Sequence, residues 1–445
     1  MAQDPRQQAF LALQAIAHGG FADEVLAKIL QQDLSEPDKR LTTELVYGSV
    51  RRQRTLDALI DQLGKKQSNR QPPNLRLILH LGLYQLRYLT QVPPSAAVNT
   101  SVELAKNNGF AGLSGVVNGI LRQYIRLSAS ELVSDPLQLP TDPIQRLAVL
   151  HSYPDWIVEV WQAQFGLENA QKLCDWMNQP PRIDLRVNIL RASVDQVEAA
   201  MQAVGVLVER SPVLPQALRL VNHAGAIRNL PGFEEGWWMV QDWSAQLVSH
   251  CVNPLPGETV IDACAAPGGK ATHLAELMGD RGVVWACDKT QSRLKKVQQN
   301  CDRLGLQSVQ IETADSRTLT QFTDQADRVL VDAPCSGLGT LHRHADARWR
   351  QTPATVQGLA TLQAELLDQA ATWVKPLGTL IYATCTLHPT ENENQIEHFL
   401  TTHPDWKLQP IVNLPGSKFV SSEGWIKVLP HQHSMDGFFM AQLSR

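Results

Sequence analysis

The sequence feature that most constrains the fold is an alternation of short apolar runs and longer helical segments in the second half of the chain. Each short run is rich in β-branched or apolar residues, which predicts buried strands over 259–263, 282–287, 308–313, 327–331 and 379–383. Strands that alternate with helices form a parallel, doubly wound sheet, whose ligands bind at the carboxyl ends of the strands. We therefore expect an α/β Rossmann-like domain over 236–445. Two last strands, over 424–429 and 437–443, would complete the sheet in antiparallel fashion.

The front of the chain is predicted to be an all-α bundle over 1–130. Apolar residues recur at helical spacing over 6–128, and the pairs Pro72-Pro73 and Pro93-Pro94 separate the helices. This region has 15 basic and 10 acidic residues, a charge of +5, which leaves −9 for the remainder of the chain. A basic front on an acidic body suits a polyanionic partner such as RNA, although solvated helix faces explain the same pattern equally well.

A small α/β module, RRM-like in its predicted elements, is expected over 145–235 after a linker at about 129–145. Residues 183–188 alternate like a strand, and Ser193 is placed to cap a helix that ends at Gly205. Arg186 and Asn188 share one face of that strand, because side chains two residues apart point the same way. They could form an edge that faces nucleic acid, or they could be ordinary exposed polar residues.

Composition limits the class of protein. The 445 residues are 43% hydrophobic and 19% charged, the N-terminus lacks a basic and apolar leader, and no apolar run is long enough for a membrane span. We therefore expect a cytoplasmic protein without a membrane partner. The seven cysteines form no C-x-x-C pair, so we expect reduced thiols and no metal.

A glycine-bearing turn follows the first strand of the predicted sheet, and its sequence is Cys264-Ala265-Ala266-Pro267-Gly268-Gly269-Lys270. It lacks the G-x-G-x-x-G pattern that cradles a pyrophosphate, so NAD is poorly supported. A nucleoside without phosphates fits better, and S-adenosylmethionine (SAM) is the obvious candidate. Asp288 would then bind the ribose and Asp315 would lie beside the adenine, unless both are acids of surface turns.

Two cysteines follow two strands of the predicted sheet, in Asp332-Ala333-Pro334-Cys335-Ser336-Gly337 and in Thr384-Cys385-Thr386. A lone cysteine is usually a small buried hydrophobe, but two at strand ends beside a SAM pocket suggest nucleophilic chemistry. A thiolate that adds to C6 of cytosine makes C5 nucleophilic enough to accept a methyl group. Asp332 would assist at N3, and the second cysteine would act as a base, directly or through water. Chemistry alone leaves open which cysteine attacks.

These motifs resemble those of the NOL1/NOP2/Sun family of RNA cytosine-C5 methyltransferases. Val46-Tyr47-Gly48-Ser49-Val50 and the segment 116–122 resemble the NusB-like RNA-binding helical domain. The segments 240–246 and 230–233 narrow the resemblance to the bacterial RsmB (Sun) type, which modifies small-subunit ribosomal RNA. The resemblance covers essentially the whole chain.

The resemblance implies roles that the residues alone do not assign. Cys385 would be the nucleophile and Cys335 would assist release of the adduct, while SAM contacts would come from 264–270, Asp288, Asp315 and Asp332. The segment 341–349 resembles a basic substrate loop, with alanine at position 345 where a proline is usual, and Ala263 replaces a bulkier apolar residue.

The partner that the resemblance implies is 16S ribosomal RNA, before full subunit assembly, with the protein a monomer. Two alternatives remain open. One is a transfer-RNA cytosine-C5 methyltransferase, and the other is a catalytically silent RNA-binding protein of ribosome assembly. Intact Cys385, Cys335, Asp332 and Asp288 argue against the silent protein.

Overall fold

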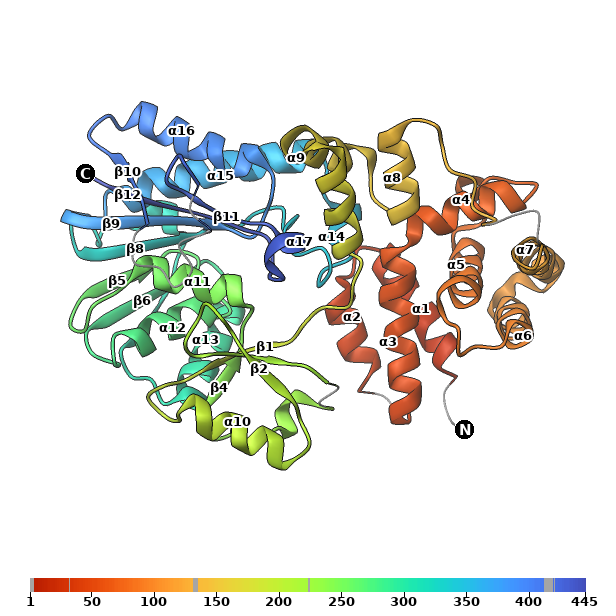
Figure 1. Cartoon of the computed structure of the whole chain (residues 1–445), viewed down its shortest axis with the longest axis horizontal. Coiled ribbons are helices and arrows are strands. Elements are labelled where there is room, and N and C mark those ends of the chain that lie inside the picture. The colour runs from red at the N-terminus through yellow and green to blue at the C-terminus, as the bar shows by residue number, and fades with distance from the viewer. Residues whose placement is uncertain (1–3, 32, 131–134, 223–224, 412–418, 420) are drawn as a thin grey trace. The chain divides into compact units, whose positions relative to one another are not determined.

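The chain divides into two compact units in the computed structural model (Figure 1), which describes residues 4–31, 33–130, 135–222, 225–411, 419 and 421–445. Unit 1 consists of residues 1–179 and 341–350, and unit 2 of residues 180–340 and 351–445. The expected linker at 129–145 lies partly outside the described residues. The division into domains at 1–130, 145–235 and 236–445 stays a prediction. None of the helices in the described part of the chain is long and apolar enough to cross a membrane.

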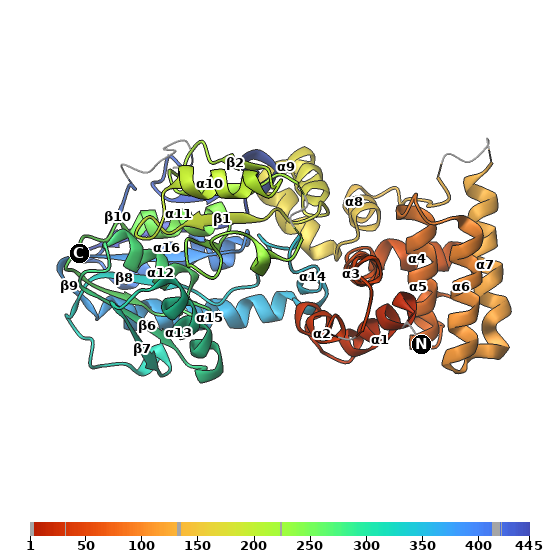
Figure 2. The ribbon, with the colours of Figure 1, turned by 90° about the horizontal axis from the view of Figure 1, so that it is seen from below.

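Unit 1 is built from helices, as predicted for residues 1–130. Pro73 and Pro94 are each the first residue of a helix. Proline suits this position because the N–H that it lacks would have no acceptor within the helix there. The two proline pairs therefore separate helices. Figure 2 shows α6 and α7 side by side. The helices are α1 (Pro5–Ala17), α2 (Ala22–Ile29), α3 (Glu36–Arg51), α4 (Gln53–Leu63), α5 (Pro73–Tyr88), α6 (Pro94–Ala105), α7 (Ser114–Ser128), α8 (Pro143–His151), α9 (Asp155–Trp176) and α14 (Ala347–Arg350).

The segment 341–350 belongs to unit 1, although it follows the strand that carries Asp332. Ala345 is fully buried in the helical core, and the guanidinium of Arg348 is fully buried as well. Arg348 donates to the backbone oxygen of Ser152 at 3.1 Å and to Oδ1 of Asn178 at 3.0 Å. The reading of this segment as a basic loop that contacts substrate is therefore wrong for Arg348, whose guanidinium is buried and hydrogen-bonded inside the unit.

Unit 2 begins with a small antiparallel sheet in the order β2-β3-β1-β4. Ser193 caps the helix beside it, accepting from the backbone N–H of Gln196, and Gly205 follows that helix with a positive φ, as predicted. The elements are β1 (Asp184–Val187), α10 (Val194–Ala203), β2 (Val208–Arg210), β3 (Ala217–Leu220) and β4 (Trp238–Val240).

Arg186 and Asn188 do not form an exposed edge. Both side chains are fully buried. Arg186 forms an ion pair with Glu276 at 2.8 Å, and Asn188 donates to the backbone oxygens of Gly236 at 3.2 Å and Leu304 at 3.1 Å. The prediction of a nucleic-acid-facing edge is wrong, because Arg186 of β1 and Asn188, just after it, pack against the larger part of unit 2.

The larger part of unit 2 contains the predicted doubly wound sheet, with strand order β10-β12-β9-β8-β5-β6-β7. Strands β5 to β9 pair in parallel, and the last strand, β12, pairs antiparallel with β9, as predicted; β10 was not predicted. The strands are β5 (Thr259–Asp262), β6 (Val283–Asp288), β7 (Val309–Thr313), β8 (Ala326–Asp332), β9 (Val374–Thr384), β10 (Lys407–Gln409), β11 (Ile426–Val428) and β12 (Phe438–Ser444).

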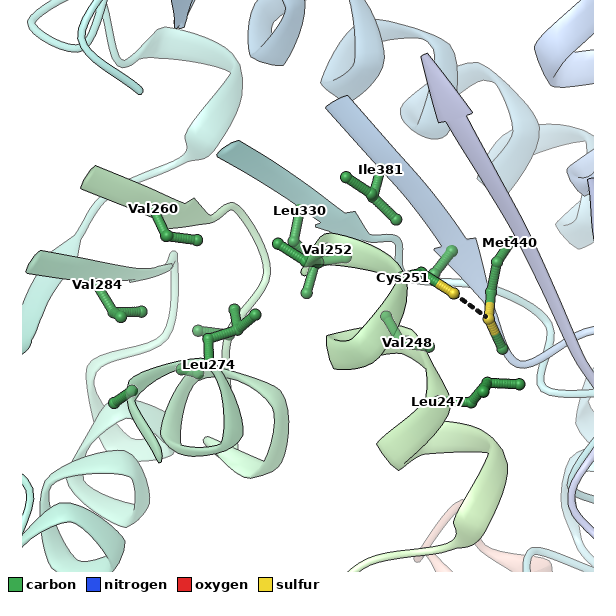
Figure 3. Close-up of a cluster of buried hydrophobic side chains, with 14 of the residues drawn as sticks. Leu247, Val248, Cys251, Val252, Val260, Leu274, Val284, Leu330, Ile381 and Met440 are labelled. Atoms are coloured by element: carbon green, nitrogen blue, oxygen red, sulfur yellow. Dashed lines mark hydrogen bonds between the residues drawn. The ribbon is translucent and has the colours of Figure 1, made fainter. Parts of the chain in front are cut away.

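Helices cover both faces of this sheet (Figure 1). Successive side chains of a strand point to opposite faces of the sheet, so neighbouring residues belong to different cores. Val260 packs with α11 and α12, and Ile261 packs with α15 and α16. Figure 3 shows the first of these cores, where strand side chains meet α11 and α12. The helices are α11 (Trp243–Val252), α12 (Gly269–Leu277), α13 (Gln291–Leu304), α15 (Pro353–Ala371), α16 (Glu393–Thr402) and α17 (Pro430–His433).

Candidate active site

A cavity of about 250 Å³ opens at the carboxyl ends of strands β5 to β9, where a doubly wound sheet binds its ligands. It brings together eight of the residues that the sequence singled out. These are Cys264, Ala266, Lys270, Asp288, Asp315, Asp332, Cys335 and Cys385. The remaining lining comes from Ala263, Lys289, Arg293, Ser316, Arg317, Ala333, Pro334, Leu362, Leu366 and Phe438.

The glycine turn between β5 and α12 contributes Cys264, Ala266 and Lys270 to the cavity wall, whereas its other residues do not line the cavity. The backbone N–H of Ala265 donates to the oxygen of Cys287 at 2.9 Å, which ties the turn to the neighbouring strand β6. Gly268 has φ +104°, and a Cβ there would lie 3.1 Å from Cα of Val297. Only glycine therefore fits this position. The bond between Ala266 and Pro267 is cis, and Gly269 begins α12.

Asp288 ends β6 and is almost fully buried. Its carboxylate accepts from the backbone N–H of Thr290 at 2.9 Å and from Arg293 at 3.2 Å. Arg293 also donates to the backbone oxygen of Ala266 at 2.7 Å, so one side chain joins the acid of β6 to the glycine turn. Asp288 is thus held rigidly at the strand end rather than exposed on a surface turn.

Asp315 follows β7 and lies nearer to solvent. Arg317 donates to both of its carboxylate oxygens, at 3.0 and 2.6 Å, and lowers the pKa of Asp315 to about 2. Arg317 is itself held by Glu365 of α15 at 2.6 Å. Asp315 is therefore an anion at neutral pH, at the rim of the cavity.

Two acids, Asp262 and Asp332, lie near Lys270 at the ends of their strands. Asp262, at the end of β5, is buried, and burial together with the nearby Asp332 raises its pKa to about 7. Lys270 donates to Asp332 at 2.6 Å, and this partner outweighs the effect of burial and raises the pKa of Lys270. Lys270 thus stays protonated between two carboxyl groups.

The two candidate cysteines lie in contact because their strands are neighbours. β8 and β9 pair in parallel with Asp332 opposite Ala383, so the residues that follow each strand emerge side by side. The Sγ atoms of Cys335 and Cys385 are 3.3 Å apart, and one sulfur donates its proton to the other. The structure thus brings together two thiols that are 50 residues apart in the sequence.

The hydrogen bond between the thiols is the main cause that lowers the pKa of Cys385 and raises that of Cys335. Among the nearby charges, Asp332 disfavours a thiolate at Cys385 and the ammonium of Lys270 favours one, while the carboxylate of Glu391 disfavours a thiolate at Cys335. The two shifts favour a thiolate at Cys385 over one at Cys335. Burial beside acids raises the pKa of Cys264, so that thiol stays protonated.

The residues of the cavity fit SAM better than a phosphate-bearing cofactor. Asp288 and Asp332 line the cavity at the strand ends, where carboxylates suit the hydroxyls of a ribose and the cationic groups of SAM, and the glycine turn lacks the pattern that cradles a pyrophosphate. Asp288 ends the second strand of the sheet, the position that suits a ribose. Among the described residues, no group of His, Cys, Asp and Glu side chains could hold a metal ion.

Several residues in or near the cavity escaped the sequence prediction. Arg293 lies on α13 and Phe438 starts β12, more than 100 residues away in sequence, and the ammonium of Lys270 lies 5.2 Å from the Phe438 ring. Gly339 lies so close to its neighbours that a Cβ would be 2.1 Å from the oxygen of Gly437 and 2.7 Å from that of Cys385. The only signal in the sequence for Gly339 was its place shortly after the first cysteine motif.

Three family descriptions match successive parts of the chain. Residues 3–126 match the NusB family, residues 153–226 match an RsmF/B-like ferredoxin-like domain, and residues 249–444 match the 16S rRNA methyltransferase RsmB/F family. The matches agree with the predicted classes of fold: a NusB-like helical domain, a small α/β module and a Rossmann-like methyltransferase domain.

The chain is similar to curated proteins along its whole length. It is 50% identical to the "probable ribosomal RNA small subunit methyltransferase B" of Synechocystis, and the match covers 99% of each chain. It is 37% identical to the protein of the same description in Bacillus subtilis, over 94% of this chain and 93% of that one. Among solved structures, PH0851 matches with a TM-score of 0.82 and 26% identity, and covers 100% of both chains.

Proposed function

This chain belongs to the RsmB/F family of 16S rRNA methyltransferases, and we propose that it transfers a methyl group from SAM to C5 of a cytosine in 16S ribosomal RNA. The observation that carries this proposal is the pair of sulfur atoms 3.3 Å apart, at the ends of adjacent strands and beside Lys270 and Asp332. Methylation at an oxygen or an amine needs no such pair, whereas C5 of cytosine needs a nucleophile that adds to C6 and a group that helps the adduct to break down.

In the proposed reaction, the Cys385 thiolate adds to C6 of cytosine, and a C–S bond forms. Asp332, which shares a hydrogen-bonded proton with Lys270, stabilises the charge that develops toward N3. C5 then accepts the methyl group of the sulfonium, whose own S–CH₃ bond breaks. A base assisted by Cys335 removes the C5 proton, the ring double bond re-forms, and Cys385 leaves as a thiolate.

SAM supplies the activated methyl group in this scheme. The glycine turn 264–270 would line the methionine part, Asp288 would accept hydrogen bonds from the ribose hydroxyls, and Asp315 would lie beside the adenine. Asp332 would lie at the junction of the donor and the cytosine. The rigid support of Asp288 by Thr290 and Arg293 is consistent with such a role, since a binding acid must not turn into solvent.

The helical front, over 1–130, and the small module, over 145–235, would bind the RNA, and 236–445 would carry the catalysis. The +5 charge of residues 1–130 supports the first of these roles. We place the protein in the cytoplasm as a monomer that acts on RNA before the small subunit is complete.

The proposal is tested with the full chain, methyl-labelled SAM and unmodified transcripts of 16S ribosomal RNA and of transfer RNA. We expect label in the 16S transcript alone, as 5-methylcytosine at one position when the product is mapped by bisulfite sequencing. Label in transfer RNA alone would show that the substrate is transfer RNA and not 16S ribosomal RNA. Absence of label from both transcripts and from 16S ribosomal RNA in partly assembled particles would overturn the enzymatic assignment.

The roles of the two cysteines are tested by trapping the adduct. A Cys335→Ala variant should form a protein–RNA complex that survives a denaturing gel, because attack by Cys385 remains possible while breakdown of the adduct is slow. The matched Cys385→Ala variant should form no such complex. An adduct in Cys385→Ala and none in Cys335→Ala would reverse the two roles.

A further inference from the structure

A buried acid outside the predicted site joins the two loops that carry the cysteines. Glu391 lies in a short 3-10 turn after β9, six residues beyond Cys385, and its side chain is fully buried. Nothing in the proposed reaction uses it. A buried carboxylate is costly unless it is fully hydrogen-bonded, so its partners indicate what it does.

The first loop bound by Glu391 is the one that carries Cys335. The backbone N–H of Ser336 donates to Oε1 of Glu391 at 2.8 Å, and the Ser336 hydroxyl donates to Oε2. Gln363 of α15 donates from the same Nε2 to Oε1 of Glu391 at 3.0 Å and to the backbone oxygen of Pro334 at 2.9 Å. The residues on both sides of Cys335 are thus held through one carboxylate.

The second loop is the one that carries Cys385. The hydroxyls of Thr386 and Ser336 are 2.7 Å apart, so the residue after one cysteine is bonded to the residue after the other. Asn392 donates to the backbone oxygen of Thr386 at 3.0 Å, and the Tyr382 hydroxyl donates to the backbone oxygen of Glu391 at 2.6 Å. Glu391 is therefore anchored to β9 on one side of Cys385 and, through two hydroxyls, to the residue on its other side.

We propose that Glu391 is a positioning residue of the active site, whose carboxylate braces the Cys335 loop against the Cys385 loop and holds the two sulfur atoms in contact. The Ser336 N–H and the Gln363 amide both donate to Oε1, whereas the partner of Oε2 is a hydroxyl, which can either donate or accept. Its charge also disfavours a thiolate at Cys335, which keeps the proton on the sulfur that assists and leaves Cys385 free to attack.

The brace can be measured without RNA or SAM, so the result does not depend on the proposed methylation. Diamide oxidises two neighbouring thiols to a disulfide by taking up their two hydrogen atoms. We expect it to link Cys335 and Cys385 in the wild-type chain, detected as a linked peptide by mass spectrometry. Glu391→Ala should slow this reaction about tenfold, because the loops lose their common partner. Glu391→Gln should react at nearly the wild-type rate, since an amide of the same shape can accept from the Ser336 N–H and donate to its hydroxyl.

The matched control is Glu397→Gln, which makes the same charge change on the exposed face of α16 and should leave the linking rate unchanged. Equal rates in Glu391→Ala and the wild type would overturn the proposal. So would a Glu391→Gln variant as slow as Glu391→Ala. If Glu391→Ala does not fold, Ser336→Ala removes only the bridging hydroxyl. A slower linking rate in that variant supports the brace, and an unchanged rate contradicts it.

The catalytic consequence rests on the proposed function and is measured separately. Misplacement of a reacting group by about 1 Å can cost about a hundredfold in rate, so Glu391→Ala should lower kcat by about 10- to 100-fold. The KM for SAM should change less than about twofold, because Glu391 does not line the cavity. Glu391→Gln should restore most of kcat. If Glu391→Ala forms the disulfide slowly but has a normal kcat, Glu391 holds the two loops together without a role in catalysis. If its KM for SAM rises by as large a factor as its kcat falls, the substitution disturbs the structure in general.

Discussion

Two arginines are fully buried in this protein, one in each compact unit, and their charges are compensated in different ways. Arg186 of unit 2 meets a carboxylate: its Nε and Nη2 atoms donate to the two oxygens of Glu276 at 2.9 and 2.8 Å. Arg348 of unit 1 meets neutral oxygens, including the backbone oxygens of Arg51 at 3.2 Å and Ser152 at 3.1 Å. The Tyr153 ring lies 4.2 Å from its guanidinium.

Whether a buried arginine has a charged or a neutral partner determines how much stability is lost when that partner is removed. Arg186 also donates to the backbone oxygen of Gly269 at 2.6 Å, at the start of α12 in the glycine turn. The buried pair therefore ties the small module to the wall of the cavity. Arg348 fills a polar gap among helices, where burial without a counter-charge lowers its pKa to about 10. Loss of a partner should thus be more damaging around Arg186, where one charge would be left alone.

The largest expected effect is that of Glu276→Gln. Removal of one partner of a buried ion pair costs about 3–5 kcal/mol, because the remaining charge has no counter-ion. We expect a loss of this size in the free energy of unfolding of unit 2, measured by urea denaturation. Hydrogen exchange should become faster in peptides from α12 and β1. A loss below about 1 kcal/mol, equal to that of the exposed control Glu397→Gln, would contradict the assigned role of the pair.

A smaller loss is expected for Arg348→Met. The substitution removes the charge itself, so no ion is left unpaired, and the cost is that of several buried oxygens without donors, about 2–3 kcal/mol. Exchange should become faster in peptides from α9 and from 341–350, with α12 unaffected. A loss as large as that of Glu276→Gln would show that the two arginines do not differ in the way proposed.

Replacing both members of the Arg186–Glu276 pair tests whether the loss in Glu276→Gln comes from the unpaired charge. In the double variant Arg186→Met with Glu276→Leu, no buried charge remains, and the cost should fall to about 1–2 kcal/mol, less than that of Glu276→Gln alone. The measurement is a double-mutant cycle of urea denaturation with both single variants. Additive losses would mean that the two side chains act independently.

The smallest expected effect is a pH dependence in the region of Arg186. Burial, and then the charge of Arg186, lowers the pKa of His250 from 6.5 to about 4. The unfolded chain therefore binds more protons than the folded chain between these values, and stability is lost as the pH falls from 6.5 toward 4. Between pH 7 and pH 5.5 the wild type should lose about 1 kcal/mol more than a His250→Gln variant. Equal losses in the two proteins would contradict this assignment.

Most of the fold and eight of the residues that line the cavity could be predicted, because they depend on local patterns. The order of strands and helices in unit 2 follows from apolar periodicity, and Asp288, Asp332, Cys335 and Cys385 follow strands that could be recognised. Arg186 and the segment 341–349 were misread, since a basic residue in a strand or loop is usually exposed. The burial of Arg186 and Arg348 depends on partners that are distant in the sequence: Glu276 for Arg186, and backbone oxygens of unit 1 for Arg348.

By itself the sequence determined the classes of the parts and the strand ends at which two thiols and three acids would lie. It did so because strand and helix periodicity, turn residues and chemically reactive side chains are all properties of short segments. The tertiary structure alone decided which residues join those segments: the contact between the two sulfur atoms, the brace through Glu391, and the partners of both buried arginines. Such contacts link residues far apart in the chain, and no local pattern records which distant group will satisfy a buried charge.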